Sequence, residues 1–91
     1  MRKRIKNYPE YEICSNGQVY SLRRNTFLKP IVTKKGYTQV NLSVNGKRKA
    51  VLIHRLVAEA FIPNPDNLPE IDHIDTNRAN NNVDNLRWCT R

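Results

Sequence analysis

The sequence predicts an α+β fold in which an N-terminal antiparallel β-meander is followed by one short helix and then a β-hairpin. Three observations favour this fold class. Turn-forming residues recur at short intervals through the first half, a central segment spaces its apolar residues as a helix does, and apolar residues flank a long polar run near the end. At 91 residues, the chain has the length of one small domain.

Four turn signals divide the first half: Ser-Asn-Gly at 15–17, Arg-Asn at 24–25, Lys-Gly at 35–36 and Asn-Gly at 45–46. Short β-rich runs lie between them, which is typical of a meander. The clearest predicted strand is 37–44, where apolar and polar residues alternate so that one face is buried. Asn45-Gly46 is then expected to close a tight hairpin onto residues 47–53.

Charge is distributed unevenly along the chain. Its 16 Lys and Arg exceed its 8 Asp and Glu, which gives a net charge of +8. Residues 1–55 hold 13 basic and 2 acidic side chains, whereas residues 56–91 hold 3 and 6. A basic first half suits contact with phosphates, so double-stranded DNA is the expected partner. An acidic second half suits a divalent cation beside those phosphates.

The basic residues of the first half concentrate at predicted turns and strand ends, and residues 2–6 form a basic arm. A sheet with such edges can lie along a duplex with its cations on phosphates. The alternative is that these charges only protect the sheet edges from aggregation. The predicted DNA-binding residues are Arg23, Arg24, Lys34, Lys35, Lys47, Arg48, Lys49 and, at the start of the helix, Arg55.

One amphipathic helix is predicted over 53–61, where Ile53, Leu56, Val57, Ala60 and Phe61 share a face. Pro63 ends the pattern. So short a helix is not stable alone in water and must pack on the sheet. His54 is expected to have a structural, hydrogen-bonded role there.

Several classes of protein are disfavoured. Cys14 and Cys89 are the only cysteines and have no metal-ligand spacing, which argues against a disulfide scaffold and a zinc finger. No apolar run is long enough to cross a bilayer, so we expect a cytoplasmic protein that does not contact membranes. Nothing predicts a small-molecule cofactor.

The second predicted hairpin carries the residues with the most distinctive chemistry. A Pro-rich loop at 64–69 leads to it, and Ile71, Ile74, Leu86 and Trp88 frame a polar loop. Asp72 offers a hard oxygen ligand, and its neighbour His73 offers an imidazole, which is suited to proton transfer near neutral pH. Asn85 begins the returning strand, so its amide is expected to reach and orient the ring of His73.

The polar loop contains further asparagines that have a simpler interpretation. Asn77 and the run 80–82 are expected to form turns by bonding to nearby backbone. A calcium-binding EF-hand is excluded, because Ala79, Asn80 and Leu86 occupy positions that need a ligand, a glycine and a glutamate.

The segment HRLVAEAFIPNPDNLPEIDHIDTNRANNNVDNLRWCT resembles the HNH family of phage and intron homing endonucleases, which have the ββα-metal fold. YEICSNGQVYSL resembles the N-terminal β module that often precedes that nuclease. The resemblance divides the chain into a DNA-binding module at 1–52 and a nuclease motif at 53–91. It implies an enzyme that nicks or cuts double-stranded DNA with one Mg²⁺ or Mn²⁺ ion, and a nickase is the expected type. His73 matches the general base, Asp72 a metal ligand and Asn85 the residue that orients the base.

In the family, a final helix follows the hairpin and carries the last metal ligand, whereas this sequence stops at Arg91. We therefore expect weak cation binding, and we expect Leu86 and Trp88 to be less covered than in a full-length relative. The alternative to an active nuclease is a catalytically impaired DNA-binding fragment or remnant.

Overall fold

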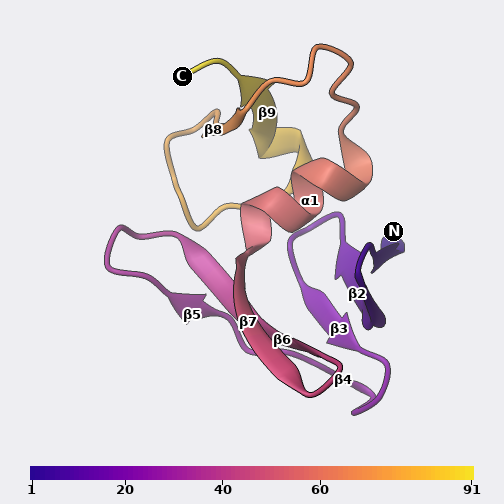
Figure 1. Cartoon of the computed structure of the whole chain (residues 1–91). Coiled ribbons are helices and arrows are strands. Elements are labelled where there is room, and N and C mark those ends of the chain that lie inside the picture. Colours follow the sequence, from indigo (N-terminus) through magenta and orange to yellow (C-terminus); the bar gives the residue numbers. More distant parts are fainter.

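The computed structural model describes residues 1–91 and contains nine strands, one α-helix and one 3₁₀ helix. The helices are α1 (Ile53–Phe61) and η1 (Val83–Asn85). The strands are β1 (Arg2–Ile5), β2 (Tyr8–Cys14), β3 (Val19–Ser21), β4 (Thr26–Phe27), β5 (Ile31–Val32), β6 (Thr38–Val44), β7 (Lys47–Leu52), β8 (Glu70–His73) and β9 (Leu86–Cys89). The predicted α+β class is confirmed (Figure 1).

The predicted meander is divided into two sheets rather than one. β1 to β4 form a four-stranded antiparallel sheet, and β5 to β7 form a three-stranded one. The break lies between Phe27 and Ile31, where Pro30 has no N–H with which to continue a ladder. The expected basic arm is itself strand β1, and Arg2 pairs there with Glu12.

The predicted hairpin between β6 and β7 is confirmed. Its turn residues, Asn45 and Gly46, both have positive φ, as a two-residue turn between twisted strands requires. Val40 and Leu42 on β6 are fully buried, whereas Asn41 between them is exposed. The alternating pattern therefore places one face of β6 in the core.

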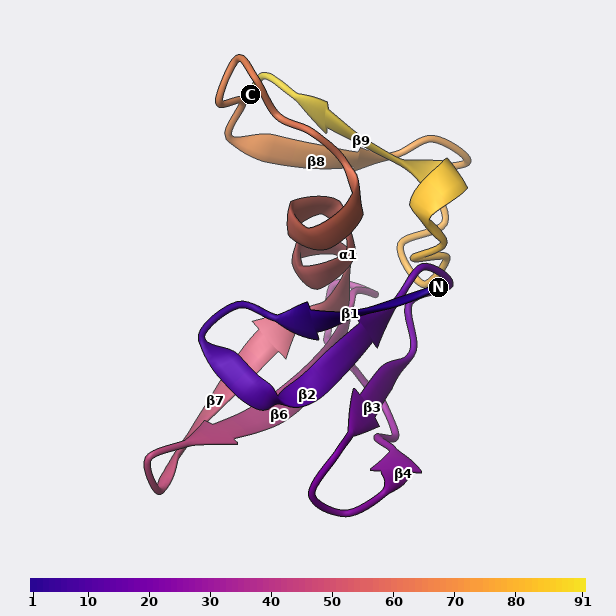
Figure 2. The same cartoon turned by 90° about the vertical axis from the view of Figure 1, so that its right-hand side faces the viewer.

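Helix α1 has the predicted bounds and lies between the two sheets and the β8–β9 hairpin (Figures 1 and 2). Its buried residues join a core cluster shared by all three sheets: Ile5, Tyr11, Ile13, Val19, Val40, Leu42, Ile53, Leu56, Val57 and Leu86. Burial of this face supplies the stability that nine helical residues lack alone. The helix thus connects the meander strands to the hairpin.

The second predicted hairpin is also confirmed, with His73 opposite Leu86 and Asp72 opposite Arg87. Leu86 is well covered in this chain. Its side chain is 5% exposed because it packs into the shared core. Trp88 is half-buried and donates from Nε1 to the carbonyl of Ile62, 3.0 Å away. No helix of the chain has both the length and the apolar character needed to span a bilayer.

Candidate active site

His73 is the last residue of β8, and its side chain points into the molecule. The residue is 6% exposed. Its ring lies 5.2 Å from that of His54 and 6.0 Å from that of Tyr37, measured between centroids. Because the hairpin register and these rings fix its direction, the imidazole has a defined orientation.

Asn81 holds one nitrogen of this ring. Its Oδ1 lies 2.9 Å from Nε2 of His73, and its Nδ2 donates to Oγ1 of Thr38 on β6 at 2.6 Å. The other ring nitrogen, Nδ1, makes no hydrogen bond and, unlike Nδ1 of His54, is not sealed from solvent. Nδ1 of His73 is therefore the ring nitrogen without a hydrogen-bond partner in the protein.

The role of Asn81 differs from its expected one. It was predicted as a turn former with Asn80 and Asn82, yet it is buried and contacts the histidine. Asn80 and Asn82 behave as predicted, since their Oδ1 atoms accept from backbone N–H groups two residues on. The burial of Asn81 depends on segments far away in the chain, so neither its residue type nor the local sequence distinguishes it.

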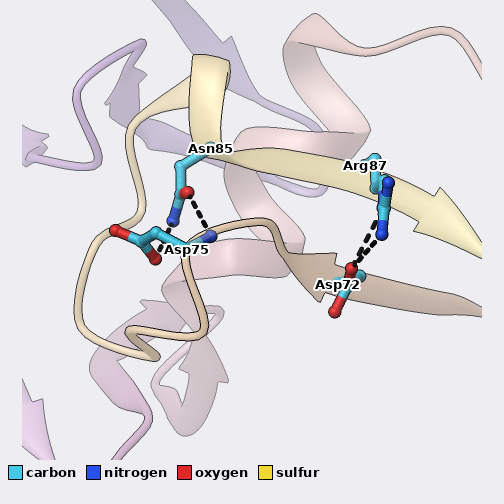
Figure 3. Close-up of polar contacts among 4 residues, drawn as sticks. All are labelled: Asp72, Asp75, Asn85 and Arg87. Carbon is cyan, nitrogen blue, oxygen red and sulfur yellow. Dashed lines mark hydrogen bonds and ion pairs between the residues drawn. The ribbon is translucent and has the colours of Figure 1, made fainter.

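Asn85 does not contact the imidazole, which corrects its expected hydrogen bond to His73. Its Oδ1 accepts from the backbone N–H of Asp75 at 3.0 Å, and its Nδ2 donates to Asp75 Oδ1 and to the carbonyl of Asn80, both at 2.9 Å (Figure 3). The side chain lies inside the bend that follows β8, and the loop folds around it. Asn85 thus shapes the loop that carries Asn81.

Asp75 is the centre of the loop's hydrogen bonds. Nδ2 of Asn80, the backbone N–H of Asn77 and Nδ2 of Asn85 all donate to its carboxylate. These hydrogen bonds, with that from Asn80 the largest cause, lower the pKa of Asp75 below its ordinary value because they favour the charged form. The loop is therefore held together by an ionised carboxylate.

Asp72 lies on the opposite face of β8 from His73, since neighbouring strand residues alternate. Its Oδ2 accepts from Nε and Nη2 of Arg87 across the hairpin, at 3.0 and 2.8 Å (Figure 3). The structure therefore does not bring the carboxylate and the imidazole into contact. Both groups remain candidates for the same site because they are adjacent in the chain.

The donor set fits a loosely held divalent cation but not a preformed cage. Oδ1 of Asp72 makes no hydrogen bond, so one carboxylate oxygen is available. No group of three or more His, Cys, Asp or Glu side chains could together hold a metal. Mg²⁺ commonly binds through one or two carboxylates, with waters and substrate phosphates as its other ligands. Asp72 suits that kind of site.

His54 is buried next to His73 but is not hydrogen-bonded as expected. Its Nδ1 has no partner. Burial, together with the nearby His73 and Arg55, lowers the pKa of His54 from 6.5 to about 4. The ring is therefore neutral near pH 7 and serves as a packing element between Tyr37 and His73.

The predicted DNA-binding residues occupy separate parts of the surface. The β3–β4 turn, with Arg23 and Arg24, and the β6–β7 hairpin, with Lys47 to Lys49, lie away from β8 and β9 (Figures 1 and 2). Lys34 and Lys35 are close to the polar loop, because Nη1 of Arg78 donates to the carbonyl of Lys35 at 2.6 Å. All of these side chains are exposed.

Arg55 is half-buried and lies 5.8 Å from the ring of Trp88. It also lines a groove of about 770 Å³ between β1, β2, β7 and α1. Five cationic side chains and one carboxylate line this groove: Lys3, Arg4, Lys6, Lys49, Arg55 and Glu59. Of the predicted set, Lys49 and Arg55 therefore converge on one concave surface, together with cations of β1 and the turn after it.

Two family profiles match the chain, and together they cover most of it. The profile described as HNH endonuclease matches residues 51–91, and the NUMOD4 motif matches residues 2–43. The chain carries a NUMOD4 motif followed by an HNH endonuclease domain. The resemblance seen in the sequence is thereby confirmed.

Individual proteins with similar sequences support the match to the HNH endonuclease family. DNA endonuclease I-HmuI of Bacillus phage SP01 is 39% identical over 98% of this chain and 52% of its own length. An uncharacterized HNH endonuclease of Acanthamoeba polyphaga mimivirus is 46% identical over 94% of this chain and 26% of its own length. H-N-H endonuclease F-TflII of Escherichia phage T5 is 38% identical, with 47% of its length covered. The chain thus spans about half or less of these relatives.

A solved structure has the same fold as the two units together. The structure described as "DNA binding and cleavage by the HNH homing endonuclease I-HmuI" superposes with a TM-score of 0.91 over 99% of this chain and 52% of that one. The NUMOD4 motif and the HNH domain are therefore arranged in this chain as in that enzyme. The predicted boundary between residues 52 and 53 stays a prediction.

Proposed function

We propose that this chain acts as a divalent-metal-dependent HNH endonuclease of the homing type, which nicks double-stranded DNA. The observation that carries the proposal is the geometry of His73, whose Nε2 is held by Asn81 while Nδ1 is left for a substrate. A general base needs an accessible nitrogen on a ring of fixed orientation. The name of DNA endonuclease I-HmuI, and the description of its structure as one of DNA binding and cleavage, support DNA as the substrate class.

The proposed reaction is hydrolysis of a phosphodiester bond. Nδ1 of His73 takes a proton from a water molecule, whose oxygen attacks phosphorus. The bond from phosphorus to the 3′ oxygen breaks, and the departing 3′ oxygen takes up a proton from solvent water, which leaves a 5′-phosphate and a 3′-hydroxyl. Attack and departure occur on opposite sides of phosphorus in an in-line displacement.

Asp72 would hold the metal, with Mg²⁺ or Mn²⁺ as the proposed ion. When bound, such an ion would neutralise the charge that develops on the phosphate and the leaving oxygen. Arg87 must release Oδ2 if both carboxylate oxygens are to bind the ion. We propose that the cationic groove and the exposed Lys and Arg of the NUMOD4 motif contact DNA phosphates.

Supercoiled plasmid incubated with Mg²⁺ or Mn²⁺ tests the proposal. We expect relaxed circles to form, EDTA to abolish them, and His73→Ala to slow their formation strongly. A general base typically contributes about 10²- to 10⁴-fold, so residual nicking by His73→Ala should be weaker by that factor. Asn77→Ala, in an exposed part of the same loop, is the matched control and should nick normally. Equal nicking by His73→Ala and the unaltered chain would overturn the assignment.

A second candidate function is DNA binding without cleavage. It is favoured by the single available carboxylate and by the ion pair that Arg87 makes with it. This function predicts duplex binding that weakens with salt, by roughly 0.9 in the log–log slope for each phosphate neutralised, and that is indifferent to EDTA. Binding without any nicking in either metal would favour it over the nuclease.

A further inference from the structure

Asn81 is the side chain that makes a hydrogen bond with the ring of His73. Its residue is 5% exposed, so the hydrogen bond between Oδ1 and Nε2 is shielded from water. A carbonyl oxygen only accepts hydrogen bonds, and therefore Nε2 must carry the hydrogen. In a neutral imidazole, a hydrogen on Nε2 leaves a bare lone pair on Nδ1.

The amide of Asn81 is itself held from the other side. Its Nδ2 donates to Thr38 Oγ1, and Thr38 is buried at the start of β6. With its nitrogen fixed on Thr38, the amide presents its oxygen to the ring. The hydroxyl of Thr38 thus holds the amide of Asn81, although 43 residues of sequence separate the two.

The turn between β2 and β3 supports the backbone of Asn81. A Cβ at Gly17 would lie 3.0 Å from Cβ of Asn81 and 3.2 Å from its carbonyl oxygen, so any side chain there would press on the backbone of Asn81. The φ of Gly17, +94°, also favours glycine. Next to this contact, the N–H of Val83 donates to the carbonyl of Ser15 at 2.8 Å. Two segments of the NUMOD4 motif therefore hold the residue that contacts His73.

We propose that Asn81 is a positioning residue, which Thr38 and the Gly17 turn hold in place so that it fixes His73 as the Nε2–H tautomer with Nδ1 directed to the substrate. The proposal rests on the proposed function for its catalytic meaning. Its structural content, the tautomer, is independent of cleavage. On this view, the NUMOD4 motif contributes to the chemistry of the HNH domain as well as to DNA contact.

The tautomer can be measured directly by proton–nitrogen correlation spectra of the imidazoles in the free protein, without DNA or metal. The chain has only two histidines, so His54→Gln assigns both signals. At a pH where the rings are neutral, we expect His73 to be almost entirely the Nε2–H form. A dominant Nδ1–H form in the unaltered chain would overturn the proposal.

Three variants separate positioning from general stability. Asn81→Asp retains an acceptor oxygen and should retain the Nε2–H form, whereas Asn81→Leu should give a mixture of tautomers. Thr38→Val keeps the Asn81 side chain but removes its hydrogen bond to Thr38, so it should lower the Nε2–H fraction of His73. This variant provides the test if Asn81→Leu does not fold. Asn77→Ala is the control and should change nothing. An unchanged tautomer in Thr38→Val or in a folded Asn81→Leu would overturn the proposal.

The plasmid assay then distinguishes the two ideas. If the chain nicks DNA, Asn81→Leu should lower kcat about tenfold or more with KM unchanged, and Asn81→Asp should restore much of it. If the unaltered chain fails to nick but the tautomer responds as expected, the positioning role stands and the nuclease proposal fails. Nicking with an unaffected tautomer in folded Asn81→Leu would leave the nuclease and remove the role of Asn81.

Discussion

Arg87 lies against the carboxylate of Asp72, which we propose as a metal ligand. This contact should weaken the affinity of the protein for a divalent cation. The ion pair with Asp72 is largely exposed, and such pairs contribute about 0.2 to 1 kcal/mol. Arg87→Ala should therefore tighten binding of Mn²⁺ by about two- to fivefold, because the ion no longer displaces a guanidinium. Isothermal titration of the DNA-free protein measures this affinity.

Lys47→Ala is the matched control for Arg87→Ala, since it removes the same charge from an exposed position on β7. It should leave Mn²⁺ affinity unchanged within error. If both substitutions tighten binding equally, net charge and not the Asp72 contact controls the affinity.

His54 makes stability depend on pH through its low pKa of about 4. The unfolded chain takes up a proton near the ordinary pKa of 6.5, whereas the folded chain does not until about 4. The free energy of unfolding should therefore fall as pH is lowered from 6.5 to about 4, by on the order of 3 kcal/mol in total. Urea unfolding at a series of pH values measures the decrease.

His54→Gln removes that titration and should flatten the curve in this window. Asp75 contributes with the same sign at more acidic pH, because its lowered pKa gives stability that is present above its ordinary value and lost as pH falls further. Identical slopes for both proteins between pH 6.5 and about 5, where carboxylates are still ionised, would contradict the role of His54.

Among the larger elements, the loop between β8 and β9 depends on Asn85. Asn85→Ala removes three hydrogen bonds and leaves the N–H of Asp75 and the carbonyl of Asn80 without their partner. We expect the free energy of unfolding to fall by about 2 to 3 kcal/mol. Amide hydrogen exchange at Asp75 should also become faster, and nuclear magnetic resonance measures both changes.

Asn77→Ala is a fair comparison, because it loses one exposed hydrogen bond to Ala79 in the same loop. Its effect should stay below about 1 kcal/mol. Equal losses in the two variants would show that Asn85 has no special place in the loop.

The elements that could be predicted from the sequence are those specified locally. The bounds of α1 follow from its apolar spacing, and the β6–β7 hairpin follows from Asn45-Gly46 and the alternation before it. The division into two sheets was missed, although Pro30 gave the relevant signal. The pairing of Asp72 with Arg87 depends on the register of β8 and β9. That register could not be predicted, because the loop that joins the two strands consists of irregular turns.

The candidate site was predictable in part for the same reason. Residue types and spacing identified His73 and Asp72, but a sequence does not show which of several neighbouring asparagines is buried. Asn81 is distinguished from Asn80 and Asn82 only by its contacts with Thr38 and Gly17, which are distant along the chain. Long-range contacts of this kind have no local sequence pattern.

For the whole molecule, the shared core predicts a single unfolding event. Val40 and Leu42 of the meander strands pack in the same cluster as Leu56 of the helix and Leu86 of the hairpin. Neither part retains a complete core without the other, so unfolding should be cooperative. Fluorescence of Trp88, the only tryptophan, reports the hairpin, and far-ultraviolet circular dichroism reports the sheets. The two urea transitions should coincide, and separate midpoints would indicate independent units.

The contact of Gly17 with Asn81 also limits how such proteins can be rearranged by recombination. A gene fusion that joined this HNH segment to a different β-rich partner would preserve Asp72, His73 and Asn85, yet it would lose the surface that seats Asn81. Such a chimera should keep the HNH sequence motif, but the imidazole of His73 would lack the hydrogen bond that orients it. Exchange of N-terminal β-rich segments between proteins of this architecture is therefore expected to preserve the seat of Asn81 only where the donor also brings a glycine and a hydroxyl residue at positions equivalent to 17 and 38.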